Sequence, residues 1–337
     1  MSYPENQPLA DWLAQESAET VLEPDLAIID PHHHLWDIRS FGEEPYASFQ
    51  EKVYLCEEIS KDIQACGHNI TKTVFAQCGA FYRQDGPDLM KCVGETEFVQ
   101  GIVAMSRSGL YGSTQLCAGI FGTADLRIGQ GVQPVLEAHV RASSNFRGIR
   151  SAFPRDLNPL FMEGYGILEK LKLSFDNYSP DHRRLPVLAE LAKAFPLVPV
   201  IVNHLGGKID HQADSTAFAD WRQSIDAVAG CSNAYMKVGG AQQRVGPWEP
   251  VFHNRQRRKP MNSEELCDLL FPYYSYVIEA FGPDRCMFES NFPVDKECVS
   301  YGTLWNMFKR IAARLGLSEA EKSALFSGTA GRVYRLD

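Results

Sequence analysis

The sequence predicts an α/β fold, specifically a (β/α)8 TIM barrel in a single domain, and three observations lead to this expectation. Short apolar runs alternate with longer amphipathic stretches along almost the whole chain of 337 residues. The runs are mostly non-alternating and rich in β-branched or aromatic residues, as expected of parallel strands that are covered on both faces. No G-x-G-x-x-G motif follows the first run, which disfavours an open dinucleotide-binding sheet.

Eight such runs predict the barrel strands, each followed by a helix. They cover residues 27–34, 73–78, 118–125, 146–152, 173–178, 198–204, 234–239 and 286–292. The stretches between them favour helices. Residues 55–67 and 129–143 carry apolar residues at helical spacing, and Ser318 with Glu321 forms a capping-box pattern near the C-terminus.

We expect residues 1–25 to form an N-terminal extension and residues 26–337 to form the barrel. Two long βα loops, 35–54 after the first strand and 240–262 after the seventh, belong to the C-terminal barrel face, where such loops build active sites. The second loop contains the basic run "HNRQRRKP". A solvated loop is the favoured interpretation of this run, and a lid that contacts an anionic substrate is the alternative.

The composition limits the classes of function. A net charge of −9 disfavours nucleic acid or an anionic membrane as the main partner, because both reward clustered positive charge. No stretch approaches the roughly 20 apolar residues of a membrane span, and the N-terminus lacks the pattern of a secretory signal. Nine cysteines without a C-x-x-C pair favour a reducing compartment, so we expect a cytoplasmic protein. The stretch "FPYYSY" favours helix packing, with a homo-oligomer interface as the alternative.

Three histidines end the first apolar run, in "IIDPHHHLWD". Because side chains alternate on a strand, His32 and His34 share one face and His33 points away. At the end of the first barrel strand that face looks into the barrel mouth, where two imidazoles can meet a metal ion or hydrogen-bond one substrate carbonyl. The alternative for this pair is a polar cap on the barrel end. For His33 we favour a structural contact between strand and helix.

The sixth and eighth strands end in polar residues that the same reasoning places at the mouth. The motif "VIVNHLGG" adds His204 as a third histidine, and "CMFESNFPVDK" adds Glu289, Asn291 and Asp295. A metal-assisted hydrolase of this architecture would need a carboxylate here to activate water. Asn291 cannot act as a base, because an amide does not take up a proton near neutral pH. Asp295 is available four residues later, and Glu289 stays open between a structural and a catalytic role.

Polar side chains at other strand ends are candidates for substrate binding. An arginine such as Arg150 can clamp a carboxylate through two parallel hydrogen bonds, and a buried ion pair with Asp176 is the alternative. The candidate substrate-binding residues are Gln77, Arg150, Asp176, Tyr178 and Lys237.

In combination these motifs resemble the amidohydrolase superfamily, specifically the amidohydrolase-2 group that contains sugar lactonases and 2-pyrone-4,6-dicarboxylate lactonase. The likeness spans nearly the whole chain. It includes "DPHHHLWD", "GETEFVQGI", "FRGIRSAF", "VNHLGG", "RCMFESNFPVD" and "LFSGTAGRVYRL". The resemblance implies a (β/α)8 hydrolase with His32, His34 and His204 in its site.

The eighth strand departs from the group's pattern. That pattern looks like S-D-W-P, with the aspartate activating water, whereas this chain has Asn291 at the second position of "SNFP". The bridging carboxylated lysine of the binuclear amidohydrolases also has no clear counterpart. Lactonases of the group work without a bound metal. The resemblance therefore implies either no required metal or one divalent ion, zinc or manganese, on His32, His34 and His204.

The leading hypothesis is a hydrolase that opens a lactone or related cyclic ester of a small, polar, carboxylated molecule. The candidate catalytic residues are His32, His34, His204, Asn291 and Asp295. The imidazoles would polarise the carbonyl, and Asp295 or a histidine near its ordinary pKa would activate water. One alternative is a mononuclear zinc- or manganese-dependent amidohydrolase or decarboxylase. The other is a barrel that kept its ligand pocket and lost turnover. The presence of Asn291 in place of an aspartate is the observation that supports this alternative.

Overall fold

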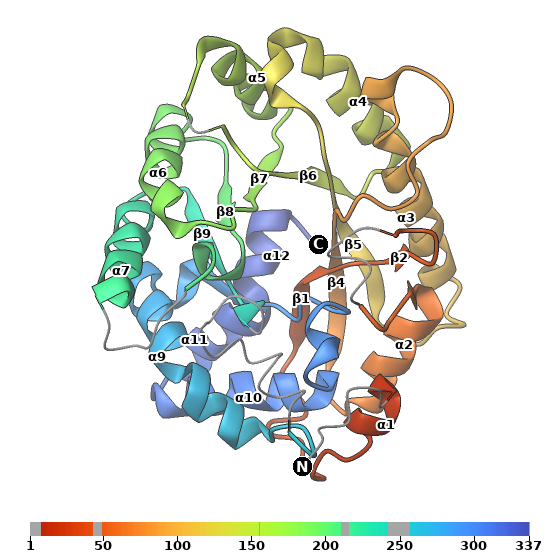
Figure 1. Ribbon diagram of the computed structural model, residues 1–337, viewed down its shortest axis with the longest axis vertical. Coiled ribbons are helices and arrows are strands. Elements are labelled where there is room, and N and C mark those ends of the chain that lie inside the picture. Colours follow the sequence, from red (N-terminus) through yellow and green to blue (C-terminus); the bar gives the residue numbers. More distant parts are fainter. Residues whose placement is uncertain (1–7, 43–48, 155, 210–215, 242–256, 337) are drawn as a thin grey trace.

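The protein is a barrel of eight parallel strands, which confirms the predicted fold class (Figure 1). The computed structural model describes residues 8–42, 49–154, 156–209, 216–241 and 257–336. The strands are β1 (Ile28–His33), β4 (Ile70–Ala76), β5 (Gln115–Gly122), β6 (Phe146–Ser151), β7 (Ser174–Asn177), β8 (Val200–Val202), β9 (Ala234–Val238) and β10 (Cys286–Phe288). Their order in the sheet is their order in the chain, as the (β/α)8 barrel requires.

Backbone contacts just past β10 close the barrel onto β1. His33 forms an isolated parallel bridge with Phe292, and the N–H of His34 donates to the Phe292 carbonyl at 2.7 Å. The N–H of Asn291 donates to the His32 carbonyl at 2.9 Å. Closure therefore brings the polar end of the first strand against the polar end of the eighth.

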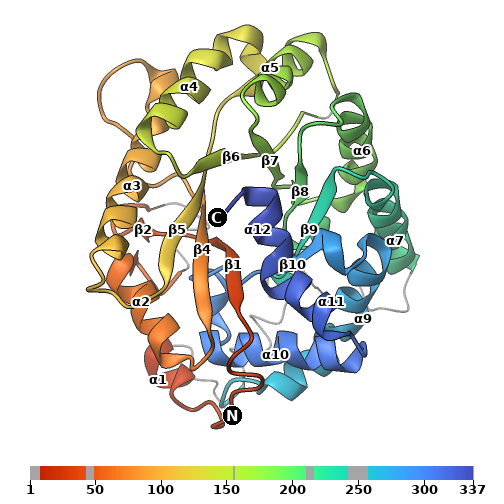
Figure 2. The same ribbon diagram turned by 180° about the vertical axis from the view of Figure 1, so that it is seen from behind.

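Helices alternate with the strands, and most of them cover the outside of the barrel (Figures 1 and 2). They are α1 (Leu9–Leu13), α2 (Cys56–Ala65), α3 (Val93–Arg107), α4 (Gln133–Ala142), α5 (Pro159–Lys170), α6 (Leu185–Ala194), α7 (Thr216–Ala229), α9 (Ser263–Phe281), α10 (Tyr301–Arg314), α11 (Glu319–Ser323) and α12 (Thr329–Tyr334). The predicted capping box of Ser318 and Glu321 begins α11. Within the helices that the structure describes, none combines the length and apolar character that crossing a membrane requires.

Several predicted boundaries differ from the observed ones. The strands β4 and β5 each begin three residues before the predicted start, because polar and half-buried residues extend the sheet through their backbone. The predicted sixth strand ends early, at Val202, and His204 lies in the short turn that follows. The stretch "FPYYSY" lies within α9, where Tyr273 and Tyr274 are buried, as the helix-packing interpretation predicts.

The two long loops are described to different extents. The loop after β1 contains a short antiparallel pair, β2 (Trp36–Asp37) with β3 (Val53–Tyr54). Most of the predicted loop 240–262, including the first half of its basic run, lies outside the described residues.

The C-terminal helix α12 lies at one end of the barrel (Figure 2). Val333 and Tyr334 pack against Ile29, Phe121 and Met287 in an apolar cluster inside the ring of strands. This cluster closes the end at which the strands begin. The carboxyl ends of the strands are the end at which a small molecule can enter.

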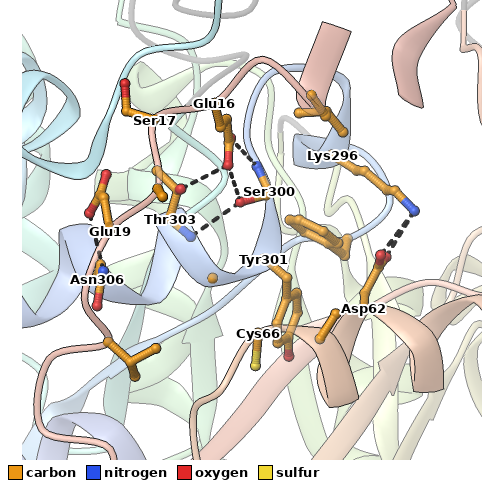
Figure 3. Close-up of a pocket in the computed structure, with 16 residues that line it drawn as sticks. Glu16, Ser17, Glu19, Asp62, Cys66, Lys296, Ser300, Tyr301, Thr303 and Asn306 are labelled. Carbon is orange, nitrogen blue, oxygen red and sulfur yellow. Dashed lines mark hydrogen bonds and ion pairs between the residues drawn. The ribbon is translucent and has the colours of Figure 1, made fainter. Parts of the chain in front are cut away.

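The N-terminal segment is anchored to α10 through acidic side chains (Figure 3). Glu16 accepts hydrogen bonds from the Ser300 N–H at 2.8 Å and the Thr303 hydroxyl at 2.9 Å. Glu19 accepts from the side-chain amide of Asn306 at 3.1 Å. A carboxylate at a helix N-terminus is favoured by the helix dipole. The cavity of about 330 Å³ beside these contacts is lined by none of the predicted site residues that the structure describes.

Candidate active site

A cavity of about 430 Å³ opens at the carboxyl ends of the barrel strands. The described residues that line it are His34, Trp36, Phe49, Gln77, Cys78, Thr123, Arg150, Ser151, Ala152, Tyr178, His204, Asn291 and Val294. Most lie at strand ends or in the turns that follow, and the aromatic residues Trp36 and Phe49 belong to the loop after β1. The cavity therefore lies where the barrel fold places its catalytic residues.

His32 and His34 face each other inside the barrel, as strand alternation predicts. Their Nε2 atoms lie 3.3 Å apart, and both residues are buried. The Nδ1–H of His34 donates to the Ala76 carbonyl at 2.7 Å. His33 points the other way and its Nε2 lies 2.9 Å from the Thr73 hydroxyl on β4. The contact of His33 is thus between strands, and the expected contact between strand and helix is not the one observed.

His204 joins this pair through a carboxylate. The ring centroids of His32 and His204 are 4.6 Å apart. Glu289, directly after β10, places Oε1 2.7 Å from Nδ1 of His204 and Oε2 2.9 Å from Nδ1 of His32. The three histidines predicted from distant segments are therefore gathered at one point, and Glu289 lies between two of them.

Lys237 and Asp176 lie deeper in the barrel, beneath the histidines. Lys237 Nζ is 2.6 Å from Asp176 Oδ2 and 3.3 Å from Nδ1 of His32, and all three side chains are buried. The Tyr334 hydroxyl of α12 donates to the Asp176 carboxylate at 3.3 Å. Neither Lys237 nor Asp176 is among the described residues that line the cavity, although both were predicted to bind substrate. The ion pair instead supports the histidines from beneath.

Arg150 provides positive charge on the cavity wall. Its guanidinium lies 4.6 Å from the centre of the Tyr178 ring. It donates to the Asn203 side-chain oxygen at 3.1 Å and to the Gln77 carbonyl at 2.9 Å. These contacts hold the guanidinium in one orientation while Arg150 and Tyr178 both line the cavity. The alternative to substrate binding was an ion pair of Arg150 with Asp176; the carboxylate of Asp176 lies 2.6 Å from Lys237 Nζ.

Asn291 and Asp295 form a pair at the rim. The Asn291 side-chain amide donates to Asp295 Oδ1 at 2.9 Å. Asn291 lines the cavity, whereas Asp295 is 1% exposed and lies outside the described lining. The Asp295 carboxylate, which was expected to activate water, is thus turned toward the Asn291 amide and not toward the cavity.

Burial sets the protonation of the paired histidines. Desolvation, reinforced by Lys237, lowers the pKa of His32 well below its ordinary value. Desolvation and the charge of Arg150 do the same for the pKa of His34. Both rings are therefore neutral at neutral pH. This corrects the expectation of a histidine with an ordinary pKa for these two residues. Desolvation also raises the pKa of Asp176, against the opposing effect of Lys237.

The donor atoms of the site fit one divalent metal ion. His32, His204 and Glu289 are buried and each offers a ligand atom within 4.8 Å of the other two. The 3.3 Å between the Nε2 atoms of His32 and His34 also matches the edge of a tetrahedral site with bonds of about 2.0–2.1 Å. His32 is common to both arrangements. Of the predicted ligand set, His32 and His204 belong to the group of three, in which Glu289 stands where His34 was expected.

These features, a (β/α)8 barrel with three gathered histidines and a carboxylate, define a hydrolase of the amidohydrolase family. The amidohydrolase family model matches residues 29–336, so the chain belongs to this family.

Three known proteins illustrate what this chain is similar to. The chain is 34% identical over 337 residues to the protein y4mH of Sinorhizobium fredii, and the match covers 93% of this chain and 99% of that protein. It is 29% identical over 156 residues to an L-fucono-1,5-lactonase of Burkholderia multivorans, over 46% of this chain and 49% of that one. Among solved structures, an amidohydrolase from Burkholderia multivorans with bound zinc superposes with a TM-score of 0.70 at 22% identity, covering 92% and 100% of the two chains.

Sequence reasoning left the role of Glu289 open and did not single out the glycines beside it. A Cβ on Gly239 would lie 2.4 Å from Cγ of Glu289, and a Cβ on Gly240 would lie 2.2 Å from Nδ1 of His204. The signal was the pair "GG" directly after the seventh strand, together with the acidic residue in "FESN". Two adjacent glycines at a strand end indicate a close approach of other groups to the backbone.

Proposed function

We propose that this protein hydrolyses a lactone or related cyclic ester of a small, carboxylated molecule. The observation that carries the proposal is a single cavity with buried imidazoles at its base and an oriented arginine on its wall. Its volume of about 430 Å³ is within the usual range for small-molecule sites and suits a compact, monocyclic substrate.

Arg150 would bind the carboxylate of the substrate. A guanidinium pairs with a carboxylate through charge-assisted hydrogen bonds that fix its orientation. Because Asn203 and the Gln77 carbonyl already hold this side chain, little side-chain freedom remains to be lost on binding. The ester carbonyl carbon would then lie toward the histidines at the base of the cavity, within reach of a water molecule that an unprotonated imidazole nitrogen activates.

A metal-dependent version of the same reaction is the second candidate, and the fit of the donor atoms favours it. His32, His204 and Glu289 would hold the ion, with Nε2 of His34 close to His32. A bound divalent ion supplies Lewis-acid polarisation of the carbonyl and lowers the pKa of bound water. Arg150 would position the substrate in the same way in either version.

Chelation separates the two candidates. The purified protein is assayed for ring opening against a panel of sugar lactones and carboxylated lactones, before and after exhaustive treatment with a chelator. Turnover that survives chelation supports the metal-free reaction. Turnover that is lost and then restored by zinc or manganese supports the metal-dependent one. Failure to open any lactone in either state would contradict the proposed function.

A further inference from the structure

The cavity contains few groups that can take a proton from water. The imidazoles among its described lining residues are those of His34 and His204. Nε2 of His34 lies 3.3 Å from Nε2 of His32. Asp295 is 1% exposed and accepts a hydrogen bond from Asn291. Among the described lining residues, His204 is therefore the candidate base.

Glu289 holds the His204 ring through its Nδ1 atom. Its Oε1 lies 2.7 Å from Nδ1 of His204, and the carboxylate is completely buried. A carboxylate oxygen accepts hydrogen bonds, so this contact is made by an Nδ1–H of His204. Nε2 is then the basic nitrogen of that ring. The second carboxylate oxygen lies 2.9 Å from Nδ1 of His32.

The backbone beside Glu289 and His204 leaves room for these two side chains to come close to it. Gly239 and Gly240 occupy the positions where a Cβ would collide with Glu289 and His204, at 2.4 and 2.2 Å. His204 itself has a φ of +51°, in a left-handed region that costs a non-glycine residue roughly 1 kcal/mol or more. Strained backbone held in place by its surroundings is typical of functional sites.

We propose that Glu289 is a positioning residue that orients His204 as the general base for water attack. His204, held by Glu289, would then take the water-activating role that the aspartate has in the S-D-W-P pattern, because this chain has Asn291 at that position. This inference rests on the proposed lactone hydrolysis and names the group that activates the water.

The proton transfers balance within this arrangement. Nε2 of His204 takes a proton from water as the water oxygen bonds to the ester carbonyl carbon. The carbonyl π electrons move to the oxygen, and Glu289 faces the imidazolium that forms. When the tetrahedral intermediate collapses, the ring C–O bond breaks and the departing alkoxide takes the proton back from His204. The product is the hydroxy acid, which contains the atoms of the lactone and one water.

The protonation site of His204 can be measured without any substrate. A long-range ¹H–¹⁵N NMR spectrum of the imidazoles at neutral pH resolves which ring nitrogen carries the proton, and the nine histidines make the spectrum tractable. The His204→Asn variant assigns the signal. We expect a protonated Nδ1 and an unprotonated Nε2 on His204. A wild-type His204 with its proton on Nε2, or with Nδ1 occupied by a metal ion, overturns the proposal.

Kinetics test the same point in the full-length enzyme. Glu289→Gln should lower kcat by about 100-fold or more while KM stays within about threefold, since general-base catalysis contributes about 10²–10⁴. Glu289→Asp keeps the carboxylate and should retain at least about tenfold more kcat than the glutamine variant. Glu16→Gln is the matched control. It removes a partly buried carboxylate that caps α10 and touches none of the site.

The outcomes separate this inference from the proposed function. If lactones are hydrolysed and Glu289→Gln keeps kcat within about threefold of the wild type, Glu289 has no positioning role and the inference is wrong. If no lactone is hydrolysed, the proposed function fails, and the proton on Nδ1 of His204 still decides whether Glu289 orients that ring. Should the glutamine variant fail to fold, the aspartate variant and the wild-type spectrum carry the test.

Discussion

Replacing Gly240 with alanine tests whether the His204 ring must lie where the structure places it. A Cβ at this position would be 2.2 Å from Nδ1 of His204, a separation that no real non-bonded contact has. The ring is 3% exposed and its Nδ1 lies 2.7 Å from Glu289. It therefore cannot move aside without losing the contact with that carboxylate.

The expected cost has two parts. Gly240 has a φ of +61°, and an alanine in the left-handed region costs about 1–2 kcal/mol. Loss of a hydrogen bond to a charged group adds about 1.5–3 kcal/mol. Gly240→Ala should therefore lower the free energy of unfolding by roughly 2.5–5 kcal/mol. Gly316→Ala is the matched control, because Gly316 has a φ of +68° with nothing within 4 Å of its Cβ position. It should cost only the first part.

Urea unfolding of both variants measures this difference, and lactone turnover measures its effect on the site. Gly240→Ala is expected to lose most of its turnover at a temperature where it remains folded, whereas Gly316→Ala keeps it. If the two variants lose equal stability and both keep full turnover, the ring of His204 is not confined by Gly240. The reasoning that links the glycine pair to the site would then be refuted.

Three further predictions concern other parts of the site. Arg150→Met should lower kcat/KM for a carboxylated lactone by about 10- to 100-fold through lost charge-assisted hydrogen bonds, and steady-state kinetics should show a much smaller loss with an uncharged lactone. Glu95 of α3 is buried and accepts hydrogen bonds from the backbone N–H groups of Cys78, Gly79 and Ala80, beside the cavity wall. Burial raises the pKa of Glu95 from 4.5 to about 7, so the wild type loses roughly 3 kcal/mol of unfolding free energy as pH rises from 4.5 through 7. Glu95→Gln should remove this contribution from urea titrations across that range. Asn291→Asp would place a second carboxylate 2.9 Å from that of Asp295, so the urea midpoint of this variant should fall and its turnover should decrease. A large gain in hydrolysis would instead indicate a lapsed enzyme.

Local patterns were enough to predict the barrel and the gathering of its histidines. Alternation on β1 separates His33 from His32 and His34, and the rule that parallel strands end at one face brings His204 to the same point. These inferences need only the period of a strand and the closure of the sheet. Strand ends were less predictable, because polar residues that extend a strand through their backbone leave no apolar signal.

The contacts of the carboxylates could not be predicted in the same way. Glu289 follows β10 and His204 follows β8, so only β9 separates them. The two glycines after β9 leave room for the two side chains to meet. Asp295 does not face the cavity, because its carboxylate accepts a hydrogen bond from the Asn291 amide. Both outcomes depend on side-chain directions in the turns that follow strands, where no simple period applies. The same limit explains why Lys237 and Asp176, placed correctly at strand ends, pair with each other beneath the cavity.

The asparagine at position 291 is consistent with a working site when the neighbouring charges are considered. Glu289 and Asp295 already place two carboxylates around the end of β10, and both are nearly inaccessible to water. A third carboxylate at position 291 would be close to Asp295, and two like charges at such a distance force one of them to take up a proton. The amide avoids this repulsion and donates a hydrogen bond to Asp295 instead. The loss of the aspartate at this position and the presence of Glu289 beside two histidines are therefore compatible parts of one arrangement, in which the carboxylate acts on the imidazoles rather than on the water.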